Sequence, residues 1–358
     1  MDSAVTHPAP VHRPLTERRV SFTAGDGRPL SLLNVRGEVA PRRGPVLLVH
    51  GAGVRGRIFR APVRTSVVDA LVDHGYDVWL LDWRASIDLA RVNWTLDQAA
   101  LYDHPPAVRK VVAETGSPEV KALVHCQGST SFVMSAVAGL LPQVTTIVSN
   151  AVSLHPVVPI WSRLKLECVV PAASLMTHYL DPHWGVSAPG LVPRAFTGLA
   201  RAFHHECDNT VCKMVSLVYG AGAPALWSHE LISPETHDWL REEFGSVPLR
   251  FHRQMARCVR HGSLVSAERL PGLPQDYAAG PPRTRARFAL FAGERNRCFL
   301  PESQARTHRW LERFRGGYHS LHVLPRYGHL DMFMGEDAAR DVFPVMIEEL
   351  DRGGEPTA

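Results

Sequence analysis

The stretch VKALVHCQGSTS, residues 120–131, decides the fold predicted for this chain. It begins as a short apolar run typical of a buried strand and continues into a segment with helical character. Cys126 stands at the junction. A sharp strand-to-helix turn can present a nucleophile above a sheet, provided that the residues two positions before and after it are small. Gly128 meets this requirement and Val124 departs from it, so the stretch predicts a turn that presents Cys126.

Strand-like and helix-like segments alternate on both sides of this turn. Continuous apolar runs such as PVLLVH are typical of buried parallel strands, and the segments between them have helical spacing. Alternation of this kind predicts an α/β fold with a mostly parallel sheet and helices on both faces. The expected elements are a hairpin at 18–35, strands at 45–50, 76–83, 120–126 and 144–152, and helices at 59–74, 95–113 (broken by Pro105 and Pro106) and 129–141.

The alternation is interrupted at about residues 154–284, which are rich in His, Trp, Pro and Cys and have mainly helical patterns. It resumes with strands expected at 287–294 and 318–325 and helices at 302–314 and 336–350. One sheet with a largely helical insertion, here called the cap segment, is the simplest interpretation. The predicted divisions are a disordered arm at 1–17, a first core part at 18–153, the cap segment at 154–284 and a second core part at 285–352.

Composition excludes several classes of function. With 358 residues and 45% apolar content, the chain can bury a sizeable core. The net charge of +4 is spread among acids without a run of like charges, so no nucleic-acid partner is expected. No apolar stretch is long enough to span a bilayer, and no secretory signal is predicted. Six scattered cysteines suggest free thiols and a cytoplasmic location.

Cys126 is the candidate nucleophile. A thiolate is the reactive form of cysteine, and a helix N-terminus or a neighbouring imidazolium lowers the thiol pKa. The alternative is a buried, inert cysteine at a strand end, which is a common environment for this residue. Ser129 is a weaker candidate because it lies three residues further on, inside the expected helix.

His329 is the candidate base, because it follows the last expected strand and a triad needs an imidazole to move the proton. The orienting residue should follow the strand at 287–294. Counting back from Pro301 favours Asn296, and Glu294 remains the competing choice. An amide can hold an imidazole in one tautomer, as it does in Cys-His-Asn enzymes.

An oxyanion hole would require two backbone N–H groups. We expect one from Gln127, directly after Cys126, and the other from the loop that begins His50-Gly51, with Ala52 as its donor. Glycine there lets the backbone approach a substrate closely.

Two competing motifs are present, and neither leads us to expect a cofactor or a metal. Residues 51–56, GAGVRG, match a dinucleotide-binding G-x-G-x-x-G with Asp82 as its acid, but that interpretation leaves Cys126 and His329 unexplained. Asp82 is then a structural acid. A second group, in the cap segment, could bind zinc through imidazole and thiolate but fits no standard ligand spacing. Its members are His204, His205, Cys207 and Cys212.

Several segments resemble α/β-hydrolases. VHCQGSTS resembles the elbow of the gastric and lysosomal acid lipases with cysteine in place of serine, and GYDVWLLDWR and TLDQAALYDHPPAV are similar to segments of those lipases and of polyhydroxyalkanoate synthases. The synthases also use a cysteine. YGHLDMFMGEDAARDVFP resembles the segment with the lipase histidine, and LHPVVP and ERNRCFLPES are similar to a hydrolase domain found with cholesterol-oxidase-like oxidoreductases. The resemblance covers about residues 45–155 and 285–350 and implies the α/β-hydrolase fold with a cap.

The expected function is acyl hydrolysis through an acyl-cysteine, on a hydrophobic ester or on a thioester such as one of coenzyme A or a carrier protein. The apolar cap segment suggests a hydrophobic acyl or sterol-like substrate, although its tryptophans could equally form the core of the cap. Alternatives are an acyltransferase or synthase that passes the acyl group to an alcohol or amine, and a ligand-binding protein without activity. The tryptophans are Trp161, Trp184, Trp227 and Trp239.

Overall fold

Eight strands form one sheet in the order β1-β2-β4-β3-β5-β6-β9-β10. This computed structural model describes residues 14–354. Neighbouring strands from β4 to β10 run parallel, whereas β2 pairs antiparallel with both β1 and β4. The strands are β1 Thr16–Thr23, β2 Pro29–Arg36, β3 Pro45–Val49, β4 Asp77–Asp82, β5 Val120–His125, β6 Val144–Asn150, β9 Arg287–Gly293 and β10 Ser320–Leu324.

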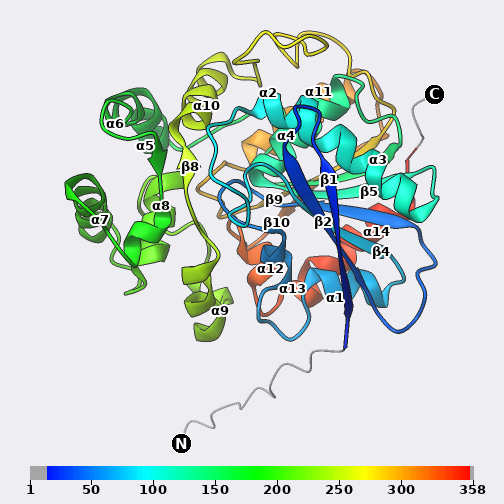
Figure 1. Ribbon diagram of the computed structural model, residues 1–358, viewed down its shortest axis with the longest axis horizontal. Helices are drawn as coiled ribbons and strands as arrows, with labels where there is room; N and C mark the ends of the chain where they lie inside the picture. The colour runs from blue at the N-terminus through cyan, green and yellow to red at the C-terminus, as the bar shows by residue number, and fades with distance from the viewer. Residues whose placement is uncertain (1–13, 355–358) are drawn as a thin grey trace, which may run out of the picture.

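Helices lie on both sides of the sheet, with α3 and α4 on one side of the strands and α1 and α14 on the other (Figure 1). The central strands β3, β4, β6 and β9 are buried along their whole length, which explains their continuous apolar sequences. The predicted α/β class with a mostly parallel sheet is confirmed. The helices outside the cap segment are η1 Gly56–Arg60, α1 Val67–Asp73, α2 Leu96–Gln98, η2 Ala99–Asp103, α3 His104–Thr115, α4 Cys126–Val137, α11 Glu302–Glu312, α12 Asp331–Met334, α13 Ala338–Asp341 and α14 Phe343–Arg352.

The predicted hairpin is present as β1 and β2. The two strands pair antiparallel, from Thr23 opposite Pro29 at the turn to Thr16 opposite Arg36. Gly27 in the connecting turn has φ 84°, a conformation that glycine adopts without strain. The predicted arm at 1–17 falls largely on residues 1–13, which lie outside the described residues. Its last two residues, Thr16 and Glu17, already belong to β1, so the strand begins earlier than the boundary predicted.

Pro105 and Pro106 do not break a helix, contrary to the sequence prediction. They occupy the first turn of α3, where proline has no intrahelical hydrogen bond to lose. A π-helical turn, η2, precedes them, and a capping box at Thr95 begins the short helix α2 before it. The prolines therefore start α3 within a nearly continuous helical segment.

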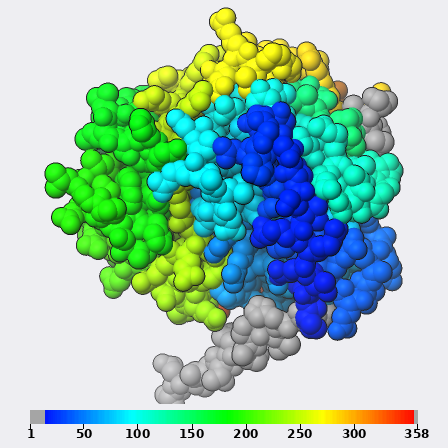
Figure 2. All heavy atoms as spheres, in the orientation of Figure 1, coloured from blue at the N-terminus to red at the C-terminus, as the bar shows by residue number. Residues whose placement is uncertain are grey.

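The cap segment is mainly helical, with a two-stranded antiparallel pairing of β7 and β8. Much of it forms the green lobe beside the sheet (Figures 1 and 2). Its elements are α5 Ile160–Leu164, η3 Lys165–Val169, α6 Val170–Ala173, β7 Tyr179–Leu180, η4 Pro182–Gly185, α7 Leu191–Phe203, α8 Thr210–Tyr219, η5 His229–Leu231, α9 Pro234–Trp239, η6 Leu240–Glu242, β8 Val247–Pro248 and α10 Leu249–His261.

Large apolar side chains lie exposed on this lobe. Trp161 is 69% exposed, Leu175 89% and Leu191 84%, whereas Trp227 is 3% exposed and packs in the core. The cap tryptophans therefore divide between core and surface. Among residues 14–354, no helix combines the length and apolarity that crossing a bilayer requires.

Candidate active site

Cys126 occupies the turn between β5 and α4. Its φ of 54° lies in the left-handed region, which is strained for a residue with a side chain and often marks a functional position. A Cβ on Gly128 would lie 2.2 Å from the His50 carbonyl oxygen, so the close crossing of α4 over β3 requires glycine. Val124 lies two residues before the turn and is fully buried, paired with Val49 of β3 and Ser149 of β6. The sheet therefore accommodates a branched residue at the position where the motif has a small one.

We predict that Gly128→Ala destabilises the protein by about 3 kcal/mol, because the added methyl group forces the backbones of α4 and β3 apart. Urea unfolding measures the change. Gly198→Ala is the matched control, since Gly198 lies in α7 with no atom within 4 Å of the added Cβ. That variant should gain up to about 1 kcal/mol of helix stability. Equal stabilities of the two variants would contradict the crowding argument.

The Cys126 thiol is surrounded by groups that favour its anion. Burial raises its pKa, but a hydrogen bond from Cys298, the electrostatic field and hydrogen bond of His329, and the Gln127 N–H together lower it to about 5. Cys126 is only 6% exposed. A depressed thiol pKa in a buried turn is characteristic of nucleophilic cysteines rather than of inert ones.

The rate of Cys126 alkylation should therefore rise with pH with a midpoint at about pH 5, because the thiolate forms as the pH rises through the lowered pKa. An ordinary thiol has a pKa of about 8.5 and would react mainly above about pH 8. Iodoacetamide rates from pH 4 to 10, followed by peptide mass spectrometry, measure the midpoint. In His329→Ala the midpoint should move to higher pH, and an unperturbed midpoint in the native protein would contradict the assignment.

Asn296 and His329 meet beside Cys126. Asn296 lies in the loop after β9, and its Nδ2 is 3.1 Å from Nδ1 of His329. Its Oδ1 accepts hydrogen bonds from the N–H groups of Cys298 and Phe299, at 3.0 and 3.1 Å. Since Oδ1 is occupied in this way, the amide donates from Nδ2, and Nδ1 of the ring acts as acceptor. In its neutral form the imidazole then carries its proton on Nε2.

Glu294, the competing candidate, is exposed, whereas Asn296 is 1% exposed. The backbone N–H of Glu294 donates to Leu324 of β10, so this residue belongs to the sheet edge. The backbone N–H of Arg295 donates to Tyr327, and the chain then turns inward at Asn296. The loop therefore directs the amide, rather than the carboxylate, towards His329.

Asp331 was missed in the sequence interpretation. Its buried carboxylate accepts from the N–H of Gly328, at 2.9 and 2.8 Å for its two oxygens, and from the N–H of Ser228 at 3.2 Å. Burial raises its pKa to about 6, against the lowering effect of these hydrogen bonds. The N–H of His329 donates to Leu226 at 2.7 Å. Asp331 thus fixes the loop that carries His329, and the acid two residues after the histidine was the available signal.

Cys298 was also missed. Its thiol lies buried between Cys126, to which it hydrogen-bonds, and the backbone carbonyl of Tyr219 at 3.6 Å. Burial raises the Cys298 pKa and so keeps this thiol protonated, with one proton for either the Tyr219 carbonyl or the Cys126 sulfur. The sequence signal was its position two residues after Asn296. All six cysteines lie in the described part of the chain, and all are free.

The His50 loop lies against the turn. A Cβ on Gly51 would be 3.1 Å from Cβ of Cys126, so the loop backbone passes directly beside the nucleophile candidate. Tyr219 donates its hydroxyl to the Ala52 carbonyl at 2.9 Å, which ties the loop to the cap segment. His50 is fully buried and contacts the Gly51 carbonyl through Nδ1 at 2.6 Å. Ala52 and Gln127 thus lie on the two chain segments that border Cys126.

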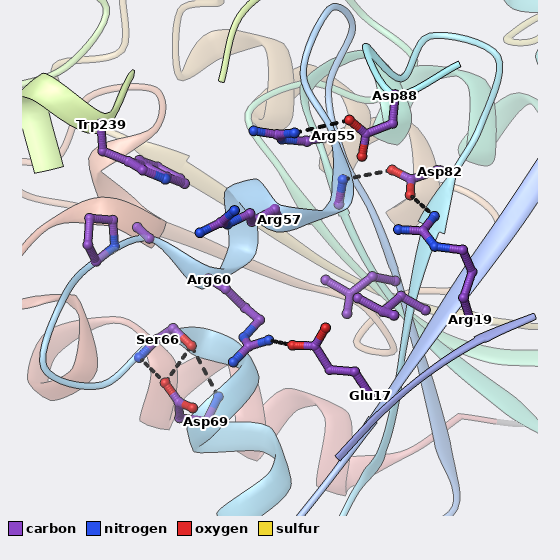
Figure 3. A pocket seen from close by; sticks show the side chains of 15 residues that line it. Glu17, Arg19, Arg55, Arg57, Arg60, Ser66, Asp69, Asp82, Asp88 and Trp239 are labelled. Atoms are coloured by element: carbon purple, nitrogen blue, oxygen red, sulfur yellow. Dashed lines mark hydrogen bonds and ion pairs between the residues drawn. The ribbon is translucent and has the colours of Figure 1, made fainter. Parts of the chain in front are cut away.

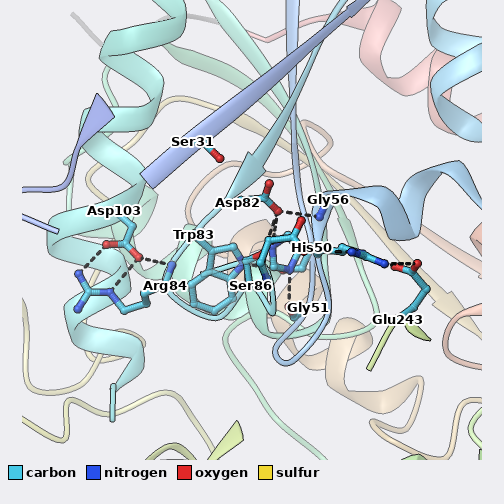
Figure 4. Close-up of polar contacts among 12 residues, drawn as sticks. Ser31, His50, Gly51, Gly56, Asp82, Trp83, Arg84, Ser86, Asp103 and Glu243 are labelled. Atoms are coloured by element: carbon cyan, nitrogen blue, oxygen red, sulfur yellow. Dashed lines mark hydrogen bonds and ion pairs between the residues drawn. The ribbon is translucent and has the colours of Figure 1, made fainter. Parts of the chain in front are cut away.

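The dinucleotide interpretation gains no support from this loop. Gly53 donates its N–H to Ala85, and its carbonyl accepts from Gly245, so its polar groups are already paired. Asp82 accepts from the Gly56 N–H and the Ser86 hydroxyl, each at 3.0 Å, which makes it a structural acid (Figure 4). The helix that follows, η1, has only five residues. A dinucleotide fingerprint instead needs free N–H groups at the start of a long helix.

A hollow of about 610 Å³ is lined in part by residues of η1 and β4 (Figure 3). Three pairs of its charged side chains form ion pairs: Arg55 with Asp88 at 3.0 Å, Arg19 with Asp82 at 3.4 Å, and Arg60 with Glu17. Cys126 and His329 are not among the residues that line it. The hollow is therefore separate from the candidate active site.

A small, mainly apolar cavity lies next to the site, although Cys126 and His329 do not line it. It measures about 30 Å³ and joins Gln127 and Cys298 to residues of the cap segment, among them Leu166, Phe251 and Met255. Lys165 and Val218 line both this cavity and a larger cap groove of about 570 Å³, so the two lie next to each other. The groove is lined mainly by apolar side chains, including Trp161, Leu164, Val169, Phe196, Leu199 and Phe203.

Lys165 is the charged residue that these two linings share. Its ammonium group donates to the carbonyl oxygens of Leu217 at 2.7 Å, of Val218 at 2.9 Å, and of Gly220. Burial lowers its pKa to about 8. The carbonyl groups at the end of α8 thus hold the cation and leave the groove itself apolar.

The zinc group suggested by the sequence is assembled differently in the structure. His205 is exposed, whereas His204, Cys207 and Cys212 come together with His229 from 17 residues beyond Cys212. The sequence spacing therefore missed the fourth member. A second group with metal-ligand chemistry, His125 with Cys126 and His329, coincides with the candidate active site.

Comparison with known proteins agrees with the fold. No family model matches the chain. A thermophilic esterase from Thermogutta terrifontis superposes with a TM-score of 0.55 at 15% identity, covering 94% of this chain and 98% of the other. A lipase in its open form superposes with a TM-score of 0.59 at 17% identity, covering 95% and 99%. The chain has the α/β-hydrolase fold.

Two curated proteins match parts of the sequence. Lipase 1 of Drosophila melanogaster is 33% identical over 124 residues, which cover 31% of this chain and 27% of the lipase. Sterol esterase 2 of Saccharomyces cerevisiae is 25% identical over 173 residues, covering 44% of this chain and 32% of the esterase. The matched part of this chain thus spans about a third or less of the length of these relatives.

Proposed function

We propose that this α/β-hydrolase-fold chain is an acyl hydrolase that works through an acyl-cysteine on Cys126. The observation that carries the proposal is the arrangement of three side chains: a thiol with a lowered pKa on a strained turn, the imidazole of His329 beside it, and the buried amide of Asn296 behind the imidazole. The lipase and the sterol esterase that match parts of the sequence support ester-type chemistry.

In the first half-reaction the Cys126 thiolate attacks the substrate carbonyl carbon, forming a carbon–sulfur bond. The N–H groups of Gln127 and Ala52 stabilise the oxyanion, since both flank the thiol on fixed backbone. Collapse of the tetrahedral intermediate breaks the bond to the leaving group. The thiolate leaving group of a thioester departs without needing a proton. Acylation by a thioester therefore does not require His329 to act as a base, and the ring can keep its proton on Nε2 as a donor to sulfur.

In the second half-reaction water attacks the thioester, and its proton must pass to Nε2 of His329. That step requires the ring proton to lie on Nδ1, where it would face the donating Nδ2 of Asn296. We therefore expect deacylation to be slower than acylation and the acyl-cysteine to accumulate. A long-lived thioester also permits transfer to an alcohol or amine, which keeps the acyltransferase alternative within the same mechanism.

The apolar groove of the cap segment is the proposed acyl-binding surface. It shares Lys165 and Val218 with the lining of the cavity beside Cys298 and Gln127, and its volume of about 570 Å³ is that of a typical small-molecule site. A long hydrophobic acyl or sterol-like group would replace water along this surface. The substrate class proposed is accordingly a hydrophobic acyl ester or thioester.

The test is intact-mass measurement after the native chain is mixed with acyl-coenzyme A thioesters and p-nitrophenyl esters of increasing chain length. We expect one added acyl group, mapped to Cys126 by peptide sequencing, with greater occupancy for longer chains. An absence of adduct and of turnover across the panel, or an adduct at another residue, would refute the proposal. Faster loss of the adduct when an alcohol or amine is added would identify a transferase.

A further inference from the structure

A second cluster of reactive side chains lies in the cap segment, away from Cys126. His204 follows α7, Cys207 lies in the next loop, Cys212 is in α8, and His229 begins η5. One ligand atom from each residue lies within 4.8 Å of every other. Nε2 of His204 is 3.6 Å from Sγ of Cys207, and Sγ of Cys212 is 3.5 Å from Nε2 of His229.

The two sulfur–nitrogen distances match the geometry of a tetrahedral zinc ion. Zinc bonds to sulfur at about 2.3 Å and to imidazole nitrogen at about 2.0–2.1 Å, which places neighbouring sulfur and nitrogen ligands about 3.6 Å apart. Two thiolates and two imidazoles form one of the common structural ligand sets. We propose that His204, Cys207, Cys212 and His229 bind a structural Zn²⁺ ion in the cap.

The remaining ring nitrogens of both histidines are directed to acceptors. Nδ1 of His204 contacts the Gly222 carbonyl at 3.0 Å, and Nδ1 of His229 lies 3.5 Å from a carboxylate oxygen of Glu206. An acceptor at Nδ1 keeps the proton there and leaves the Nε2 lone pair for a metal. Both Nε2 atoms are the ones that face the cysteine sulfurs.

The cysteines are also held for ligation. Asn209 caps α8 by accepting from the N–H groups of Val211 and Cys212, at 3.0 and 3.2 Å, and so fixes the start of the helix. Cys212 and His204 are fully buried, whereas Cys207 and His229 are half-buried.

Four protein ligands leave no open position, so the ion would be structural rather than catalytic. It would join the α7–α8 connection to the segment 225–231. That segment holds the loop of His329, because Leu226 accepts from the His329 N–H and Ser228 donates to Asp331. Glu206 adds a further link by accepting from the N–H of Ala225 at 2.9 Å. The zinc would therefore stabilise the attachment of the cap to the candidate active site.

Elemental analysis of the full chain, purified with zinc present and then dialysed, tests the proposal. We expect about one Zn²⁺ per chain and, after exchange, the visible absorption bands and sulfur-to-metal charge transfer of tetrahedral Co²⁺. Cys207→Ser with Cys212→Ser should lose the metal. Cys168→Ser, an exposed cap cysteine outside the cluster, should retain it. Removal of zinc by a chelator should lower Tm, because the metal binds only the folded cap.

Co²⁺ titration of the unsubstituted protein does not depend on the variants folding. The proposal is overturned if the native chain holds no zinc and develops no tetrahedral Co²⁺ spectrum. It is equally overturned if non-reducing peptide mapping finds Cys207 and Cys212 joined in a disulfide, since a disulfide cannot supply thiolate ligands. Retention of zinc by the double cysteine variant would place the metal elsewhere.

Discussion

Cys126→Ala is expected to reduce kcat/KM for acyl esters and thioesters by at least about 10⁴-fold, because the covalent step loses its nucleophile. The neighbouring hydroxyl cannot substitute for it. Ser129 is fully buried in α4, where its hydroxyl contacts Ser149 at 2.5 Å and the Val152 carbonyl. It thus lies inside the hydrogen-bonded junction of α4 and β6 and away from the turn that carries Cys126.

Steady-state hydrolysis of a p-nitrophenyl ester, corrected for the spontaneous rate, measures the effect. Ser129→Ala is the matched control and should retain the acyl adduct and most of the activity. Circular dichroism and urea unfolding establish that both variants fold. Activity of Cys126→Ala within tenfold of the native rate would exclude the acyl-cysteine mechanism.

Asn296→Asp is expected to increase the rate of deacylation by about 10²-fold, which is the usual contribution of effective general base catalysis. One carboxylate oxygen can keep the hydrogen bonds from the N–H groups of Cys298 and Phe299 that Oδ1 now accepts. The other oxygen then accepts a hydrogen bond from the N–H at Nδ1 of His329, where the amide donates instead. The ring lone pair moves to Nε2 and faces the attacking water.

Stopped-flow kinetics separates the two steps. The native protein should release one equivalent of p-nitrophenol in a burst and then turn over slowly, whereas Asn296→Asp should lose the burst and gain in kcat. Glu294→Gln is the control, because Glu294 is exposed and its change should leave both phases intact. If Glu294→Gln changes the burst and Asn296→Asp does not, Glu294 rather than Asn296 is the orienting residue.

Part of the candidate site is predictable from the sequence because its signals are local. Cys126 and Gly128 lie within one turn, and His329 directly follows the region of the last strand. Short-range steric rules apply to such positions, since a strand that turns into a helix over a neighbouring strand leaves no room for a side chain at Gly128. The roles of these residues remain predictions for the experiments above.

Other members of the site depend on contacts between distant segments. The choice between Asn296 and Glu294 follows from how one loop turns, and nothing in GERNRC distinguishes an inward amide from an outward carboxylate. Cys298 gains its importance only from its position beside Cys126, 172 residues away (298 − 126). Pro105 and Pro106 suggested a break because local propensity does not report that they fall in the first turn of α3.

The sequence by itself determined the α/β class and the order of its strands along the chain, because continuous apolar runs of five to seven residues can be buried on both faces only in a helix-covered sheet. Tertiary structure alone decided which polar side chains meet. It brought His229 to Cys212 and Asn296 to His329, and it placed the cap groove next to the cavity beside Cys298. The reason is physical: periodicity records which side of an element is buried, whereas the partners of a buried polar group are set by how separate elements pack.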